Sequence, residues 1–84
     1  MGLFLDLDTL KADKTLDAKG LECPMPLLKS KEMIDALESG QILEILGTDE
    51  ASKIDLPIWC KRVGHTYLGV KEEGKYFKFY IKKG

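Results

Sequence analysis

The chain has 84 residues, enough for one domain with a single hydrophobic core. Its 44% hydrophobic and 32% charged residues are typical of a folded globular chain, and no apolar run approaches the roughly 18 residues of a membrane span. Thirteen basic and fourteen acidic residues give a net charge of -1, which argues against a partner held mainly through its phosphates. No export signal is visible at the N-terminus, so we expect a cytoplasmic protein.

The first 13 residues differ in pattern from the rest of the chain. Leucines at positions 3, 5 and 7 alternate with other residues, which is compatible with an edge strand or with a loosely held arm. We therefore interpret residues 1–13 as an N-terminal extension and residues 14–84 as the folded domain. This domain begins with a short predicted strand, Lys14–Ala18, followed by a loop.

A helix is predicted over Pro24–Ser39, the segment after this loop. Its apolar residues recur at helical spacing, and Ser39-Gly40 supplies a stop signal. The residues expected on its inner side are Leu27, Leu28, Met33, Ile34 and Leu37. Ile42–Leu46 then predicts a strand that is apolar at every position except Glu44, as expected where both faces are largely covered.

A second helix is predicted over Ala51–Val63. Pro57 interrupts this segment, so we expect the helix to restart there with Asp55 as its cap. Gly64 is expected to end it. The residues expected to point inward are Ile54, Ile58, Trp59 and Val63.

The C-terminal part predicts a hairpin of His65–Val70 and Tyr76–Lys82, with Gly74 at a left-handed position of its loop. The order is therefore strand, helix, strand, helix, strand, strand. Strand–helix–strand units favour parallel pairs with right-handed crossovers, and a hairpin adds an antiparallel pair. We predict an α/β two-layer sandwich, β-α-β-α-β-β, with a four-stranded mixed sheet, two helices on one face and the other face open.

One short segment, Cys23-Pro24-Met25-Pro26, holds one of the two cysteines and two of the three prolines. The spacing predicts Cys23 as the cap of the first helix, with Pro24 at the first helical position. A sulfur there faces the positive end of the helix dipole, which favours the thiolate. Because neither proline has an amide hydrogen, only Met25, and Leu27 one turn in, can donate a hydrogen bond to the sulfur. Cys23 is therefore a candidate nucleophile of moderate activation.

The remaining candidates for chemistry are few. A buried structural thiol is the alternative for Cys23, although packing alone does not call for two flanking prolines. Cys60, in the second predicted helix, is interpreted as a core thiol, and its alternative is a resolving cysteine that forms a disulfide with Cys23. Two cysteines and the single His65 are too few for a zinc site, and no base partner for a Cys-His hydrolase is identifiable. We therefore predict no metal site.

The segment Asp17-Ala18-Lys19-Gly20-Leu21-Glu22-Cys23-Pro24-Met25-Pro26 resembles the signature of the TusA (SirA-like) sulfur-carrier family, D-x-R-G-L-x-C-P-x-P. The resemblance extends from Thr15 to the C-terminus and includes Thr48-Asp49, Asp55-x-Pro57, Trp59-Cys60 and Gly64-His65. Lys19 replaces the family's usual Arg, which keeps the charge but loses the guanidinium fork. Residues 1–13 have no counterpart in the minimal family domain.

This resemblance implies the same sandwich and a sulfurtransferase role. Cys23 would accept sulfane sulfur as a persulfide from a donor such as a cysteine desulfurase or a rhodanese-like protein. It would pass the sulfur to an acceptor sulfurtransferase, in tRNA thiolation, cofactor biosynthesis or sulfur metabolism. The sulfur would be carried covalently, without a bound cofactor. The residues expected to shape the site are Gly20, Leu21, Pro24 and Pro26. The residues expected to contact partner proteins are Lys19, Glu22, Met25 and Lys29.

Two other functional classes depend on the open sheet face. On the last predicted strand, one side carries Tyr76, Lys78, Tyr80 and Lys82, while the other carries Phe77, Phe79 and Ile81. If the second set faces the helices, the first forms an aromatic and basic stripe of the kind that stacks single-stranded bases. A solvated amphipathic strand explains the same pattern, and the net charge favours it, so we do not expect a nucleic-acid partner. A regulatory module that docks on a transporter is the other alternative, with only indirect membrane contact.

Overall fold

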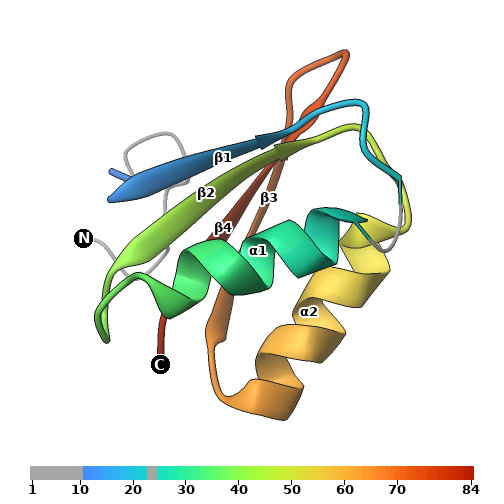
Figure 1. Cartoon of the computed structure of the whole chain (residues 1–84). Helices are drawn as coiled ribbons and strands as arrows, with labels where there is room; N and C mark the ends of the chain where they lie inside the picture. Colours follow the sequence, from blue (N-terminus) through green and yellow to red (C-terminus); the bar gives the residue numbers. More distant parts are fainter. Residues whose placement is uncertain (1–10, 23–24) are drawn as a thin grey trace, which may run out of the picture.

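Within residues 11–22 and 25–84, which are the ones the computed structural model describes, the chain forms four strands and two helices in the predicted order (Figure 1). The elements are β1 (Lys14–Ala18), α1 (Met25–Asp35), β2 (Ile42–Gly47), α2 (Ser52–Val63), β3 (Thr66–Glu72) and β4 (Phe77–Lys82). The pattern read in residues 1–10 lies outside the described part of the chain.

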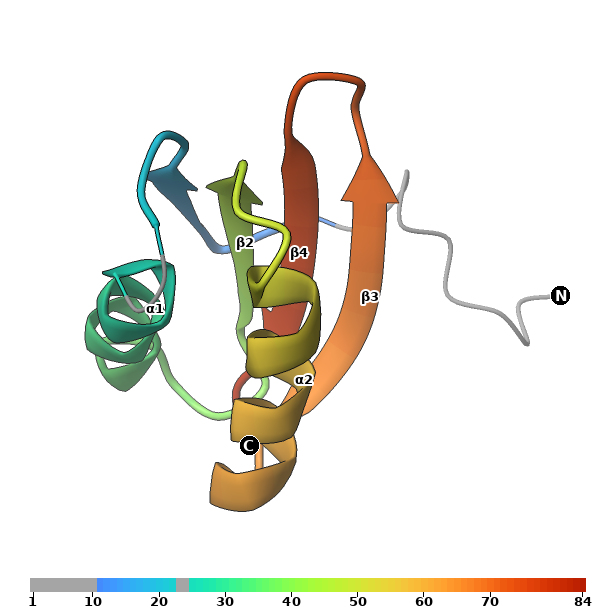
Figure 2. The same cartoon turned by 90° about the vertical axis from the view of Figure 1, so that its right-hand side faces the viewer.

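The strands form one mixed sheet in the order β1-β2-β4-β3. β1 pairs with β2 in parallel, and β4 pairs antiparallel with both β2 and β3. Both helices lie on the same side of this sheet (Figure 2). The predicted two-layer sandwich is therefore confirmed. The second strand–helix–strand unit differs in detail: β2 and β3 run in the same direction, but β4 lies between them.

The core lies between the sheet and the helices. In the register of β2 and β4, Leu43 pairs with Ile81 and Ile45 with Phe79, and all four side chains are fully buried. Phe77, Phe79 and Ile81 face the helices, because they belong to the same buried cluster as helical residues. The helices contribute Ile34, Leu56, Trp59 and Cys60 to this cluster.

Helix α1 ends at Asp35, four residues before the predicted end. The next two amides, of Ala36 and Leu37, bond to carbonyls only three residues back, at 3.1 Å each, which tightens the chain into a turn. The Lys83 ammonium then donates to the Leu37 carbonyl at 2.6 Å. A lysine from the C-terminal end thus satisfies an acceptor that a longer helix would have satisfied itself.

The prediction that α2 restarts at Pro57 is wrong. The helix is continuous through Pro57, and the Asp55 amide bonds to the Ala51 carbonyl at 2.9 Å as an interior residue, so Asp55 is not the cap. Pro57 is the sixth of the twelve residues of α2, and its missing amide hydrogen removes a single hydrogen bond from the helix interior. Gly64, with φ +92°, ends α2 as predicted, and Gly74, with φ +83°, occupies the predicted left-handed position of the hairpin.

The inner face of α2 also differs from the prediction. Trp59 points inward as expected, but three predicted core residues are exposed: Ile54 (64%), Ile58 (55%) and Val63 (49%). The residues that α2 buries are Ser52, Leu56, Trp59 and Cys60. These recur at intervals of four, three and one, which is the helical spacing of one uninterrupted helix. The assumed break at Pro57 assigned the apolar residues to the wrong side.

Candidate functional site

The predicted nucleophile Cys23 and its neighbour Pro24 lie outside the described residues, so the site is described from the chain on either side of them. On the N-terminal side, the chain leaves the sheet after Ala18, and the Leu21 amide returns a hydrogen bond to the Ala18 carbonyl at 3.2 Å. Between them, Gly20 has φ +84°, a left-handed conformation that favours glycine. The loop therefore turns back toward the helix layer directly after β1.

Two contacts connect this loop to other loops at the same end of the sheet. The Gly20 amide donates to Thr48 Oγ1 at 2.9 Å, in the loop between β2 and α2. The Lys19 ammonium lies 4.9 Å from the centre of the Tyr76 ring, just before β4. Because β1 and β2 are parallel, their carboxyl ends meet at one edge of the sheet (Figure 1). The cysteine-bearing loop is thus anchored at that edge.

On the C-terminal side, α1 begins at Met25, whose amide donates to the Glu22 carbonyl at 2.8 Å. This bond corrects the sequence interpretation, in which the Met25 amide was free to donate to the sulfur. Pro26 has no amide hydrogen, so Leu27 is the next donor in the first turn of α1. That turn contains no acidic side chain. Nothing in it offsets the positive end of the helix dipole.

The residues predicted to shape the site and those predicted to contact partners differ in burial. Pro26 is fully buried, and its carbonyl accepts a hydrogen bond from the buried Ser30 hydroxyl at 2.7 Å. Leu21 is half-buried and packs against the core. Glu22, just before the motif, and Met25, within it, are both exposed. Lys19 and Lys29 are exposed too, the first beside Tyr76 and the second one turn along α1 from Met25.

Cys60 is confirmed as a core thiol. It is a free cysteine on α2 with only 1% of its surface exposed. Burial away from water disfavours its charged form and raises the pKa of Cys60 to about 11. A thiol of this kind is almost entirely protonated near neutral pH and is a poor nucleophile.

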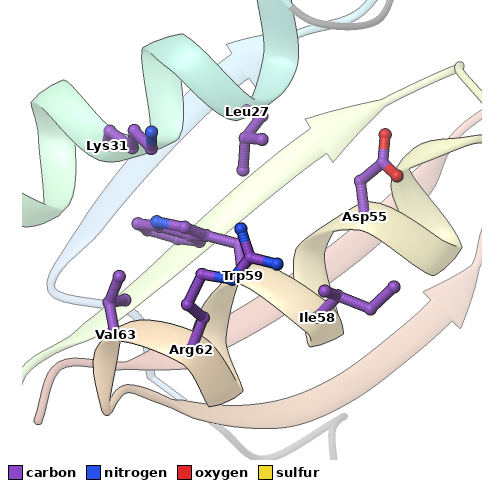
Figure 3. A pocket seen from close by; sticks show the side chains of 7 residues that line it. All are labelled: Leu27, Lys31, Asp55, Ile58, Trp59, Arg62 and Val63. Atoms are coloured by element: carbon purple, nitrogen blue, oxygen red, sulfur yellow. The ribbon is translucent and has the colours of Figure 1, made fainter.

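A groove between the two helices went undetected in the sequence. It has a volume of about 250 Å³. It is lined by Leu27, Lys31, Asp55, Ile58, Trp59, Arg62 and Val63 (Figure 3). Its α1 wall is built from residues one turn apart in the helix that follows the motif. The sequence shows that Leu27 and Lys31 are four residues apart and so lie on one side of α1. Predicting the opposite wall required knowing which face of α2 points toward α1.

The open face of the sheet does not present the aromatic stripe that the nucleic-acid alternative requires. Tyr80 is only 4% exposed, and its hydroxyl donates to Glu44 Oε2 at 2.7 Å. Burial, together with the adjacent Glu44 carboxylate, raises the pKa of Tyr80 to about 12. Tyr76 lies against the Lys19 ammonium. The alternative of base stacking on exposed tyrosines therefore loses its main support.

Two features are absent from residues 11–22 and 25–84. No group of three or more acidic, cysteine or histidine side chains comes together there as a metal site. No helix among the described residues is both long and apolar enough to cross a membrane.

The fold, with a Cys-Pro-x-Pro segment that runs from the loop after β1 into the start of α1, defines a class of small α/β proteins with a SirA-like fold. A SirA-like protein of Desulfitobacterium hafniense superposes with a TM-score of 0.73 at 22% identity, covering 84% of this chain and 97% of that one. This likeness establishes the fold. The family model described as Sulfurtransferase TusA matches residues 14–83, and the chain belongs to the TusA family.

Relatives from bacteria support this assignment. YrkI of Bacillus subtilis (strain 168) is 52% identical over 75 residues, which cover 89% of this chain and 100% of YrkI. The sulfur carrier protein TusA of Allochromatium vinosum is 44% identical over 71 residues, covering 84% of this chain and 93% of that protein. The sulfur carrier protein TusA of Pseudomonas entomophila is 37% identical over 71 residues, covering 84% and 89%. The resemblance noted in the sequence is thereby confirmed as family membership.

Proposed function

We propose that this chain is a sulfur carrier whose Cys23 holds sulfane sulfur as a persulfide and passes it to an acceptor protein. The observation that carries the proposal is the place of the Cys-Pro-x-Pro segment in the fold. It directly follows an anchored loop and leads into a helix whose first turn has no acidic side chain. Membership in the TusA family, and relatives named sulfur carrier protein TusA, support the same role.

Loading is an exchange between sulfur atoms. The Cys23 thiolate attacks the outer sulfur of a donor persulfide, R-S-SH, and forms a new S–S bond as the donor's S–S bond breaks. The products are Cys23-S-SH and the donor thiolate, R-S⁻. No external oxidant or reductant takes part, because the transferred sulfur keeps its oxidation state. The positive end of the α1 dipole favours both the thiolate before loading and the persulfide anion after it.

Unloading repeats the exchange with a different thiol. An acceptor thiolate attacks the terminal sulfur of Cys23-S-SH, the acceptor gains the persulfide, and Cys23 returns as a thiolate. The sulfur thus travels covalently, without a bound cofactor. A carrier of this kind needs a thiol that is activated but not held by many hydrogen-bond donors. Two observations are consistent with that requirement: the Met25 amide donates to the Glu22 carbonyl, and Pro26 has no amide hydrogen.

The partners follow from this chemistry. We expect a donor that presents a protein persulfide, such as a cysteine desulfurase or a rhodanese-like protein, and an acceptor sulfurtransferase with its own cysteine. Contacts with both would form around the motif. The exposed residues available for them are Lys19, Glu22, Met25 and Lys29. Met25 adds an adaptable apolar contact for different partner surfaces.

The loading step is tested by measuring intact mass after incubation with glutathione persulfide. Wild-type protein should gain one sulfur atom, about 32 Da, and lose it on treatment with a reductant. Cys60→Ser is the matched control, because it removes the buried thiol and should still load. Cys23→Ser should gain no mass. Loading of Cys23→Ser, or no loading of the wild type, would contradict the proposal.

A further inference from the structure

We infer that Thr48 is a positioning residue for the carrier cysteine; this inference rests on the proposed role of Cys23. Thr48 follows β2 directly, and its Oγ1 accepts a hydrogen bond of 2.9 Å from the Gly20 amide. The two residues are 28 positions apart in the chain. Gly20 precedes Cys23 by only three positions. A side chain in the β2–α2 loop therefore holds the backbone of the loop that carries the cysteine.

This bond differs from the other amide contacts of the loop. The amide of Lys19 donates to Asp17 Oδ1 at 3.1 Å, and that of Leu21 donates to the Ala18 carbonyl at 3.2 Å. Both partners belong to β1, from which the loop itself emerges. The Gly20 amide instead reaches across to a neighbouring loop. The Thr48 bond thus fixes the loop relative to the rest of the sheet edge, whereas the other two shape it locally.

Thr48 is itself held in a structured segment. The next residue, Asp49, accepts a hydrogen bond from the Ala51 amide at 3.1 Å through its side chain, where α2 begins. The hydroxyl of Thr48 is therefore presented between the end of β2 and the first turn of α2. Both of these elements contribute residues to the buried core. The cysteine-bearing loop is thus anchored to a rigid part of the molecule.

Persulfide exchange depends on this kind of anchoring. The attacking sulfur must approach the donor's S–S bond along one line, so the rate scales with the fraction of molecules in which the loop has the productive geometry. One neutral hydrogen bond changes the equilibrium constant between the productive and the other loop geometries by a factor of about three to ten, so the productive population falls by up to that factor. Loss of the Thr48 hydroxyl should lower the loading rate by up to that factor. A looser loop should also weaken the effect of the α1 dipole on the thiol.

The experiment compares Thr48→Val, which removes the hydroxyl at similar size, with Thr48→Ser, which retains it. Thr66→Val is the matched control: the same change at an exposed residue of β3, which pairs with Lys82 at the opposite end of the sheet. Two rates are measured for each variant: sulfur loading from glutathione persulfide, and alkylation of Cys23 by iodoacetamide as a function of pH.

Thr48→Val should load sulfur more than twofold and up to about tenfold more slowly, and its alkylation profile should move to higher pH. Thr48→Ser and Thr66→Val should stay within about twofold of the wild type on both measurements. Unchanged rates in Thr48→Val would overturn the inference, as would equal losses in the Val and Ser variants. A lower melting temperature with an unchanged pH profile would assign Thr48 a merely structural role. If the wild type gains no sulfur, the proposed function fails, while alkylation still tests the role of Thr48.

Discussion

In the folded protein, we expect iodoacetamide to alkylate Cys23 and to leave Cys60 almost unmodified. Cys60 is 1% exposed, and burial raises its pKa to about 11. At about pH 7, a thiol with this pKa is ionised in about one molecule in ten thousand, against about three in a hundred for an ordinary thiol with a pKa of about 8.5. Because the thiolate is the nucleophile, ionisation alone makes Cys60 about 300-fold slower than an ordinary exposed cysteine.

The assay follows both cysteines in one reaction. Trypsin releases Cys23 and Cys60 in separate peptides, residues 20–29 and 54–61, so mass spectrometry gives an alkylation rate for each. The control is the same reaction in urea, where the unfolded chain should expose Cys60 and label both peptides at similar rates. The folded protein should show labelling of the Cys23 peptide alone on the time scale of the experiment.

Comparable labelling of the two peptides in the folded protein would refute this reasoning. It would mean that α2 opens often enough to expose Cys60, or that its surroundings do not suppress the thiolate. Cys60 would then become a second candidate for carrying sulfur. If Cys23 were alkylated as slowly as Cys60, the result would instead contradict the activation of the thiol expected at the start of α1.

Three further predictions concern charge and stability. Because burial raises the Cys60 pKa from 9.0 to about 11, the folded state holds this proton more tightly than the unfolded state. The contribution of this thiol to stability should therefore be full below about pH 9 and fall by about 2–3 kcal/mol as the pH rises through 11. Urea unfolding at several pH values should show this loss in the wild type and not in Cys60→Ala. Tyr80→Phe removes the 2.7 Å bond to Glu44 and should lower the free energy of unfolding by about 1–3 kcal/mol; an unchanged melting curve would count against it. Lys29→Glu should slow sulfur loading of Cys23 from a rhodanese persulfide but not its alkylation by iodoacetamide, and equal slowing would mean that the lysine tunes the thiol.

The parts of the fold that were predictable depend on local signals. The β1 boundaries were correct to the residue, because a short strand is followed there by a loop with glycine. Gly64 and Gly74 were identified correctly because each has a positive φ that other residues avoid. The end of α1 was missed because the carbonyls of Asp35, at that end, and of Leu37, just beyond it, accept hydrogen bonds from Lys83, which is 46 positions from Leu37. No local pattern contains those contacts.

In the candidate site, too, features of adjacent residues were predictable and contacts between distant residues were not. The Cys-Pro-x-Pro segment was recognisable because its residues are adjacent in the chain. The bond between Gly20 and Thr48 was not predictable, because it depends on how two parallel strands align their ends. The burial of Tyr80 was missed for a related reason. Alternation along β4 indicates which face a side chain occupies, but not that Glu44, 36 positions away, accepts its hydrogen bond.

The most direct test of sulfur transport measures the sulfane sulfur that Cys23 releases. Protein loaded with glutathione persulfide is freed of excess reagent and treated with cyanide, which removes a terminal sulfane sulfur as thiocyanate and regenerates the thiolate. Wild type and Cys60→Ser should each release about one thiocyanate per chain, and Cys23→Ser should release none. Thiocyanate from Cys23→Ser, or its absence from the loaded wild type, would contradict the conclusion that Cys23 carries sulfur.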